Sequence, residues 1–387
     1  MSRKRGKIRF TFEIAVAILL LAVLAWFAWK LAGGALPDDM RGEGRALWQR
    51  VTSTLEDAAQ RVIKPAPQEA PGNAAVTTQI GSIQVFFGPC DPSDPSGIDD
   101  HLIQLLHSAK RTVFAAFYEL ESIEVAQALI ARHENGVDVK LVTDSDYAGR
   151  DALRMCRDAG IFVAQDNRSA FMHNKFCVVD GQWVWTGSTN ITGNGFYRNN
   201  NNSLLIASPL LADNYTIEFA EMFMDTFFGI KSPRNTPYPE LMAGQIRIEC
   251  YFAPEDGVER ELLEEIGAAQ QSIDVMAFSF TSEPLAEAMV ARIGQGVKVR
   301  ALFETRNAGS QYSRDDFLAA NGARVYMDTN PNAMHHKVIV IDNATVATGS
   351  YNFSAAAESS NDENVLIVHS PEVARIYTEE FERLTSR

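Results

Sequence analysis

The sequence predicts an α/β protein: two pseudo-symmetric α/β/α sandwich repeats with mostly parallel or mixed sheets, preceded by one N-terminal transmembrane helix. Two observations support this fold class. Strand-like apolar runs alternate with helical stretches from residue 79 onward, and the whole alternation occurs twice. A separate apolar run near the N-terminus, preceded by basic residues, predicts the membrane helix.

The N-terminal apolar run covers residues 14–29, and apolar neighbours extend it toward the length of about 20 residues that spans a bilayer. Arg and Lys precede the run, and Asp38 and Asp39 follow it, so we expect the N-terminus inside. Residues 1–36 are therefore predicted to be a single-pass anchor that places the folded part outside the cytoplasm, as in a periplasmic protein. Small residues at 32–35 leave a cleaved signal peptide as the alternative, which would give a secreted protein.

Residues 37–78 are predicted to connect the anchor to the folded part. Residues 45–64 have helical character, and residues 65–75 are rich in Pro and Ala, as a linker would be. The four cysteines show no CxxC pair and no zinc-site spacing. They are either free and buried, or Cys90 and Cys250 form a disulfide.

The charge balance restricts the kind of partner. The formal net charge is −14, which argues against a protein that coats nucleic acid through bulk charge. It does not exclude a local basic rim, for which Arg198, Arg306 and Arg314 are candidates.

The repeats are predicted to cover residues 79–235 and 245–387, joined by the Pro-containing segment 232–240. Residues 83–89 and 248–254 are apolar strands that end in Pro, and helical stretches follow each at 99–109 and 259–269. Buried strands come next at 112–117 and 273–278, and further strands at 136–144 and 296–304. Strands separated by helices indicate a largely parallel sheet covered by helices.

A polar motif recurs at the same spacing in both repeats. In each copy Lys follows His by two residues, and Asp follows Lys by five. A Gly-Ser-x-Asn segment then places its Asn fifteen residues after the Lys. The two copies are His173, Lys175, Asp180, Ser188 and Asn190, and His335, Lys337, Asp342, Ser350 and Asn352. An apolar strand follows each Lys, and its period of two places His and Lys on the same side.

This pattern, H-x-K-x4-D followed by G-S-x-N, resembles the signature of the phospholipase D superfamily over nearly everything after the linker. The resemblance implies a phospholipase D-like fold with the site between two lobes, and no cofactor or metal. It also implies that one His attacks phosphorus to form a phosphohistidine while the other protonates the leaving oxygen. By the same resemblance, Asp180 and Asp342 support the motif and do not shuttle protons.

The residue types suit this chemistry. Phosphodiester cleavage needs a nucleophile, an acid and groups that hold the charge of the non-bridging oxygens. Lys175 and Lys337 supply positive charge. Hydrogen bonds to the same oxygens are predicted from the Ser and Asn of each copy: Ser188, Asn190, Ser350 and Asn352.

One difference between the repeats suggests separate roles for the two imidazoles. Glu363 lies 28 residues after His335, and Asn201 lies 28 residues after His173. A carboxylate near His335 would favour its protonated form, whereas Asn201 would leave His173 neutral. We therefore predict His173 as the nucleophile and His335 as the acid, with the exchanged roles as the alternative.

Several other polar residues have weaker claims. Asp144 and Glu304 end equivalent strands and either line the cleft or support the fold. His336 points away from His335 on a strand, so a structural role is predicted for it.

The substrate is less well determined than the reaction. The amino-acid sequence after each motif resembles that of the nuclease branch of the superfamily more than that of its cardiolipin synthases. This resemblance predicts an endonuclease for single-stranded DNA or RNA. The alternatives are a phospholipase or phosphatidyl transferase at the membrane, and a non-enzymatic module that binds a phosphate polymer. Because both motifs lie in one chain, a monomer is expected to hold a complete site.

Overall fold

The computed structural model describes residues 78–93 and 95–386. The predicted anchor and linker, residues 1–77, lie outside the described residues. The described residues belong to one compact unit. Among them, no helix has the length and apolarity needed to cross a membrane.

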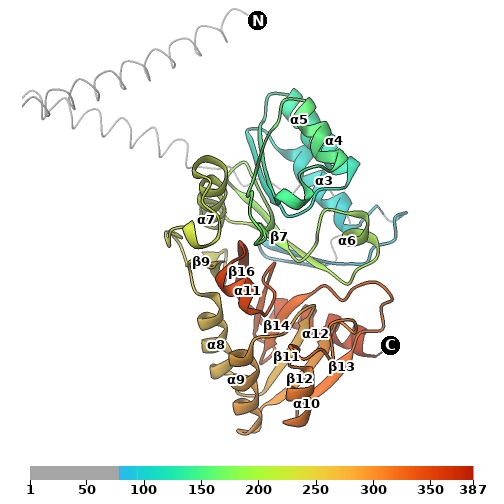
Figure 1. Cartoon of the computed structure of the whole chain (residues 1–387), viewed down its shortest axis with the longest axis vertical. Helices are drawn as coiled ribbons and strands as arrows, with labels where there is room; N and C mark the ends of the chain where they lie inside the picture. The colour runs from blue at the N-terminus through green and yellow to red at the C-terminus, as the bar shows by residue number, and fades with distance from the viewer. Residues whose placement is uncertain (1–77, 94, 387) are drawn as a thin grey trace, which may run out of the picture. The chain divides into compact units, whose positions relative to one another are not determined.

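The first repeat of the described chain builds an eight-stranded sheet in the order β1-β2-β8-β7-β6-β3-β4-β5. Figure 1 shows this repeat in blue to green, with β7 labelled. Its strands are β1 (Thr78–Ile80), β2 (Ile83–Phe87), β3 (Thr112–Phe117), β4 (Asp138–Thr143), β5 (Phe162–Gln165), β6 (Lys175–Val179), β7 (Trp183–Gly187) and β8 (Asn202–Ala207). The apolar strand that carries the motif, β6, lies in the middle of the sheet between β7 and β3 and is buried at every residue.

The second repeat builds a matching eight-stranded sheet within the described residues, in the order β13-β12-β11-β14-β15-β16-β10-β9. Its strands are β9 (Glu240–Ala243), β10 (Ile246–Ala253), β11 (Ser272–Ala277), β12 (Lys298–Phe303), β13 (Arg324–Met327), β14 (Lys337–Ile341), β15 (Thr345–Gly349) and β16 (Glu363–His369). Strand β14 takes the place of β6, so the second motif occupies the equivalent central position.

Of the predicted mostly parallel or mixed sheets, the mixed kind is confirmed and the mostly parallel kind is wrong, and the α/β class and the duplication are confirmed. Only β3-β4-β5 and β11-β12-β13 pair in parallel among the described strands, and the other pairings are antiparallel. The reason lies directly after each motif, where a tight turn reverses the chain into a hairpin. In the first repeat Asp180 and Gly181 both have positive φ, and Gln182 N–H donates to the Val179 carbonyl at 3.0 Å.

Helices cover both faces of each sheet. Each repeat places most of its helices on the outer face, where they pack on separate apolar cores. These outer helices include α3 (Ile98–Ser108), α4 (Ile123–Glu134) and α5 (Asp151–Asp158), and α8 (Val258–Ala268), α9 (Glu283–Ile293) and α10 (Asp315–Ala320). Short helices follow the motif strands: α6 (Gly193–Tyr197) and α11 (Ala355–Ser359).

Two longer helices, α7 (Pro209–Ala220) and α12 (Pro371–Thr385), contribute to a core that both repeats share. Each begins with a Ser cap followed by Pro, a favoured helix start. Tyr215 of α7 and Tyr377 of α12 are fully buried in this core together with Phe176 and Phe252. Because one apolar core contains residues from both halves, the two sheets are held together where the motif strands lie.

Candidate active site

Each motif histidine is fixed by the backbone of the opposite repeat. His173 N–H donates to the Asp362 carbonyl at 2.9 Å, and His335 N–H donates to the Asn200 carbonyl at 2.8 Å. Short parallel bridges accompany these bonds, Met172 with Asp362 and Asn200 with Met334. The two motifs therefore meet at the junction of the repeats, and neither repeat positions its own histidine alone.

The His173 ring is oriented by a carboxylate from the second repeat. Its Nδ1 lies 2.8 Å from Glu363 Oε2. Ser350 Oγ donates to the same oxygen at 2.7 Å, and Asn361 Nδ2 donates to Oε1 at 3.2 Å. An ionised Glu363 can only accept, so Nδ1 carries the proton and Nε2 keeps its lone pair.

The His335 ring is oriented in the same way by neutral groups of the first repeat. Its Nδ1 lies 2.9 Å from Asn201 Oδ1 and 3.1 Å from the Ser188 carbonyl. Ser188 Oγ donates to Asn201 Oδ1 at 2.9 Å, and Asn201 Nδ2 donates to the Gly195 carbonyl at 3.0 Å, which fixes the amide orientation. Here too Nε2 is the free ring nitrogen.

The pairing of these supporting residues corrects the sequence-based expectation. Glu363 was expected beside His335 and Asn201 beside His173, because each pair lies in one repeat. The structure exchanges the partners: Glu363 contacts His173, and Asn201 contacts His335. The physical reason is the parallel bridging between repeats, which brings the segment before β8 or β16 against the opposite motif.

Burial makes both imidazoles weak bases. It lowers the pKa of His173 to about 4, although Glu363 opposes this decrease. It lowers the pKa of His335 well below the ordinary value, and Lys337 and Lys175 lower it further. His173 is therefore neutral near pH 7 and can act as a nucleophile.

The two lysines are buried beside the histidines. Each donates through Nζ to the carbonyl of its own motif histidine, Lys175 to His173 and Lys337 to His335 at 2.9 Å. Burial lowers the pKa of Lys175 to about 7, while Glu363 and other carboxylates raise it. The pKa of Lys337 is lowered well below its usual value by burial and by Lys175. A bound phosphate anion would favour their charged forms.

Asp180 and Asp342, the motif residues for which a supporting role is predicted, do not line the cleft. The Asp180 carboxylate accepts from the backbone N–H groups of Lys110, Arg111 and Thr112 at 2.7–3.2 Å. Asp342 accepts equivalent bonds from residues 270–272 at 2.6–2.9 Å. Both occupy the turn at the far end of the motif strand, so they join that turn to the start of the neighbouring strand.

Ser188 and Ser350 also differ from expectation. Both are fully buried, and their hydroxyls bond to Asn201 and Glu363 where the sequence suggested a phosphate. Asn190 and Asn352 do line the cleft, together with His173 and His335. The side-chain oxygen of each Asn is buried with no partner, so these amides are available to a ligand.

The cleft has a volume of about 540 Å³. Its walls carry aromatic and neutral polar side chains that sequence reasoning missed, among them Tyr118, Phe171, Phe278, Phe280 and Tyr312, with Ser279, Thr281, Asn307, Ser310 and Ser313. One hint was available, because an aromatic residue follows β3 and β11 at equivalent places. Of the candidate basic rim only Arg306 lines the cleft, and it is paired with Glu304 at 2.6 Å.

Other candidates have supporting positions. Asp144 and Glu304 accept the backbone N–H of Met172 and Met334, the residues just before the histidines. His336 is fully buried, with Nδ1 3.1 Å from Asn202 Oδ1, which agrees with the structural role predicted for it. The alternative of a disulfide between Cys90 and Cys250 is not seen in the structure, and Cys156, Cys177 and Cys250 are buried.

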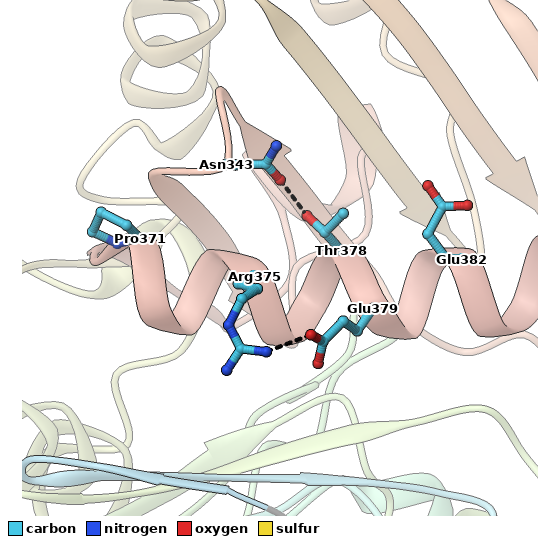
Figure 2. Close-up of a pocket in the computed structure, with 6 residues that line it drawn as sticks. All are labelled: Asn343, Pro371, Arg375, Thr378, Glu379 and Glu382. Carbon is cyan, nitrogen blue, oxygen red and sulfur yellow. Dashed lines mark hydrogen bonds and ion pairs between the residues drawn. The ribbon is translucent and has the colours of Figure 1, made fainter.

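A second hollow lies on the surface of α12, beside the turn that follows the second motif strand (Figure 2). Asn343, Thr378, Arg375 and Glu379 line it, and these four side chains already bond to one another in pairs. It contains no histidine or buried lysine, so the phosphoryl chemistry belongs to the cleft between the motifs.

Comparison with known proteins agrees with this site. A family profile described as "Cardiolipin synthase, PLD-like domain" matches residues 102–223 and 262–385. The chain is 33% identical over 206 residues to the mitochondrial cardiolipin hydrolase of Xenopus laevis, covering 52% of this chain and 92% of that protein. It is 34% identical over 131 residues to a phospholipase D of Rickettsia conorii, covering 34% of this chain and 66% of the relative.

Among solved structures, phosphatidylserine synthase of Haemophilus influenzae matches with a TM-score of 0.60 at 14% identity. That match covers 78% of this chain and 86% of the synthase, and it shows a shared fold. The family profile covers both repeats, each with its own histidine in the cleft and a buried lysine beside that histidine. This chain therefore belongs to the phospholipase D-like family and is a phosphodiesterase of the phospholipase D superfamily.

Proposed function

We propose that the chain is a metal-independent endonuclease that cleaves nucleic-acid phosphodiester bonds through a covalent phosphohistidine. The observation that carries this proposal is the pair of imidazoles in one cleft, each with Nδ1 bonded to the opposite repeat and Nε2 free. Double displacement at phosphorus requires a nucleophile and an acid in such an arrangement.

In the first step His173 Nε2 attacks phosphorus, and the bond from phosphorus to the leaving oxygen breaks. The imidazolium form of His335 gives its Nε2 proton to that oxygen. In the second step a water oxygen attacks the phosphohistidine, and His335 takes the proton that the water loses. The phosphorus–nitrogen bond then breaks, and both histidines return to their starting states.

Glu363 supports the assignment of His173 as the nucleophile for a new reason. The imidazole becomes positively charged when Nε2 bonds to phosphorus, and a carboxylate at Nδ1 stabilises that charge. His335 has only neutral acceptors, so its protonation depends on a bound phosphodiester, whose negative charge raises the pKa of a neighbouring imidazole. The exchanged roles remain the alternative.

The lysines and asparagines complete the proposed phosphate site. Lys175 and Lys337 lie close enough to both histidines to lower their pKa values, so their charge also reaches the reacting phosphate. Asn190 and Asn352 line the cleft and can donate hydrogen bonds from Nδ2 to the non-bridging oxygens.

The lining of the cleft supports a nucleic-acid substrate. Phe171 is 39% exposed and Tyr312 is 68% exposed, and both line the cleft, where the Phe171 ring lies near that of His173. Aromatic side chains bind the bases of single strands by stacking, without requiring a given sequence. Hydroxyl and amide groups between them can bond to sugars and base edges.

A second candidate is a phospholipase or phosphatidyl transferase. Two observations favour it: similar proteins have the printed names phospholipase D and mitochondrial cardiolipin hydrolase, and the one arginine in the lining of the described cleft is already paired with Glu304. Binding along a nucleic-acid backbone usually uses several unpaired cations. This candidate also agrees with the predicted membrane anchor.

One side-by-side assay separates these candidates. The full-length chain, His173→Ala and His335→Ala are each offered single-stranded DNA, RNA and anionic phospholipid vesicles in EDTA. We expect nucleic acid to be cut by the wild type alone. Lipid turnover with intact nucleic acid would replace the endonuclease with the phospholipase or transferase, and inactivity on all three would support a binding module.

The histidine roles are tested by trapping the intermediate. A radiolabelled phosphodiester is mixed with each single-histidine variant, and the protein is analysed for acid-labile phosphate. We expect the adduct in His335→Ala, which retains the nucleophile. An adduct found only in His173→Ala would exchange the two roles.

A further inference from the structure

Each active-site lysine lies against the face of an aromatic ring. Lys175 Nζ is 4.6 Å from the ring centroid of Tyr118, and Lys337 Nζ is 4.9 Å from that of Phe278. The same rings contact the histidines edge-on, Tyr118 with His173 and Phe278 with His335, each at 4.8 Å between centroids. The lysine-to-ring contact and the histidine-to-ring contact therefore occur in both repeats, although the ring belongs to Tyr in one and to Phe in the other.

The backbone fixes these rings in place. Tyr118 follows β3, and its N–H donates to the Asn174 carbonyl at 2.8 Å. Phe278 follows β11, and its N–H donates to the His336 carbonyl at 2.9 Å. Asn174 and His336 stand between the His and Lys of their motifs, so each ring is tied to the two-residue spacing of the motif.

The lysines need such a contact because they are almost completely buried, each with 1% of its surface exposed. Each ammonium has one hydrogen bond, to the carbonyl of its own motif histidine. A ring face attracts a desolvated cation without adding a negative charge that would repel a phosphate. A carboxylate in the same place would hold the lysine but also oppose substrate binding.

We propose that Tyr118 and Phe278 are positioning residues that hold Lys175 and Lys337 at the cleft and keep them charged through their ring faces. This proposal rests on the phosphodiesterase chemistry proposed above, but it holds for either substrate class. The ring is the essential part. The Tyr118 hydroxyl lies 3.4 Å from that of Tyr147 and has no counterpart at Phe278.

Other charges also act on the lysines and stay in place in the test. Glu363, Asp144 and Glu119 stabilise the charge of Lys175. Glu363 stabilises that of Lys337, while Lys175 opposes it. Because these groups remain, replacing a ring alone should lower the pKa of its lysine and move the alkaline limit of activity to lower pH.

The test compares pH profiles of kcat/KM for full-length variants on bis(p-nitrophenyl) phosphate, whose leaving group needs no acid. For Tyr118→Leu and Phe278→Leu we expect the alkaline limb to move down by about 0.4 to 1.5 pH units. Tyr118→Phe and Phe278→Tyr should keep the wild-type limb. Phe162→Leu removes an exposed aromatic ring of β5 that does not line the cleft, so its limb should also stay in place.

An equal loss of rate at every pH in the Leu variants, with no shift, would overturn the proposal, as would a shift in Tyr118→Phe equal to that of Tyr118→Leu. A second measurement does not depend on turnover: the pH dependence of sulfate binding by calorimetry, since sulfate remains a dianion over this range. As pH increases, the Leu variants should lose sulfate binding at a lower pH than the wild type does. If the wild type binds sulfate but never turns over the probe, the phosphodiesterase proposal fails while the ring proposal is still decided.

Discussion

The two imidazoles of the cleft differ in the charge of the group that their Nδ1 atoms contact. Nδ1 of His173 meets a carboxylate oxygen of Glu363, and Nδ1 of His335 meets an amide oxygen of Asn201. The difference in charge distinguishes the two histidines. It favours a cation that forms during the reaction on His173, and it leaves the protonation of His335 to the substrate.

Glu363→Gln tests the part played by that charge. An amide at this position can donate to Nδ1 and select the tautomer with a proton on Nε2, which cannot attack phosphorus. We expect kcat to fall by about 10²–10⁴-fold, as when the carboxylate of a catalytic triad is replaced by its amide. The measurement is turnover of bis(p-nitrophenyl) phosphate. Glu379→Gln, at an exposed ion pair on α12, is the matched control, and a Glu363→Gln rate equal to that of the control would contradict the role.

The pKa shifts predict the pH range of the free enzyme. The neutral fraction of His173 increases as pH rises through about 4, and the charged fraction of Lys175 decreases as pH rises through about 7. Activity as kcat/KM should therefore persist well below the ordinary histidine pKa and fall above neutral pH. A profile on the same probe whose acid limb lies near 6.5 would show that His173 is less buried in solution than in this structure.

Strand β6 and its turn illustrate how an element supports the site. Asp180 has a φ of 55°, a conformation favoured by Gly, Asn and Asp, and its carboxylate binds three backbone N–H groups that open β3. The turn thus holds β6 against β3 at the end opposite His173. The motif aspartate therefore stabilises the fold, and it supports the catalytic groups only through the position of β6.

Asp180→Ala should consequently affect the free energy of unfolding more than it affects kcat. Loss of the acceptor leaves three N–H groups without their partner and strains the turn, which should cost about 2–4 kcal/mol in the free energy of unfolding. Denaturant titration measures this cost, and Asp180→Asn should lose less because it keeps an acceptor and tolerates positive φ. A folded Asp180→Ala variant with kcat reduced as far as in His173→Ala would instead assign the aspartate to catalysis.

The segment before β16 takes part in a charged contact between the repeats. Arg168 pairs with Asp362 and donates to the Ser360 carbonyl at 2.8 Å, next to Glu363. Burial raises the pKa of Asp362 to about 7, although Arg168 opposes the increase. The arginine therefore stabilises both the charge of Asp362 and the position of the catalytic carboxylate.

In Arg168→Met the pKa of Asp362 should rise above 7. An acid whose pKa is raised in the folded state destabilises the protein as pH rises from the unfolded pKa to the folded one. We expect the free energy of unfolding to decrease from pH 5 to pH 8 by more than in the wild type. Urea titrations at both values measure this, with Arg375→Met, at an exposed ion pair, as control. If the free energy of unfolding had the same pH dependence in both variants, Arg168 would not be stabilising the charge of Asp362.

On the scale of the whole molecule, the shared core makes the two repeats depend on each other. Leu366 of β16 is fully buried in the same apolar core as Phe176 of β6 and Tyr215 of α7. Loss of packing on one side of this core should therefore be transmitted to the other repeat.

Leu366→Ala tests this coupling. We expect a loss of about 2–5 kcal/mol in unfolding free energy. Trp183 and Trp185, both in the first repeat, should report the whole loss by fluorescence, measured in a background where the tryptophans at 26, 29 and 48 are replaced by Phe. A tryptophan transition that stays at its wild-type midpoint would mean that the repeats unfold separately.

The sequence by itself determined the duplication, the α/β class and the chemical groups of the site. His173 and Lys175, like His335 and Lys337, are two residues apart at the start of a strand, and strand geometry places such residues on one side wherever the strand lies. The burial of the strands that follow also comes from their local apolar composition. These features need no knowledge of distant contacts.

The tertiary structure alone decided which groups support which histidine. Glu363 and His173 are 190 residues apart, and only the packing of the two repeats brings them together. The same holds for Arg168 with Asp362 and for the antiparallel order around the motif strands, which follows from tight turns after each motif. Local spacing determines the orientation of side chains on one strand, whereas partners from another element are chosen by how the two sheets share their core.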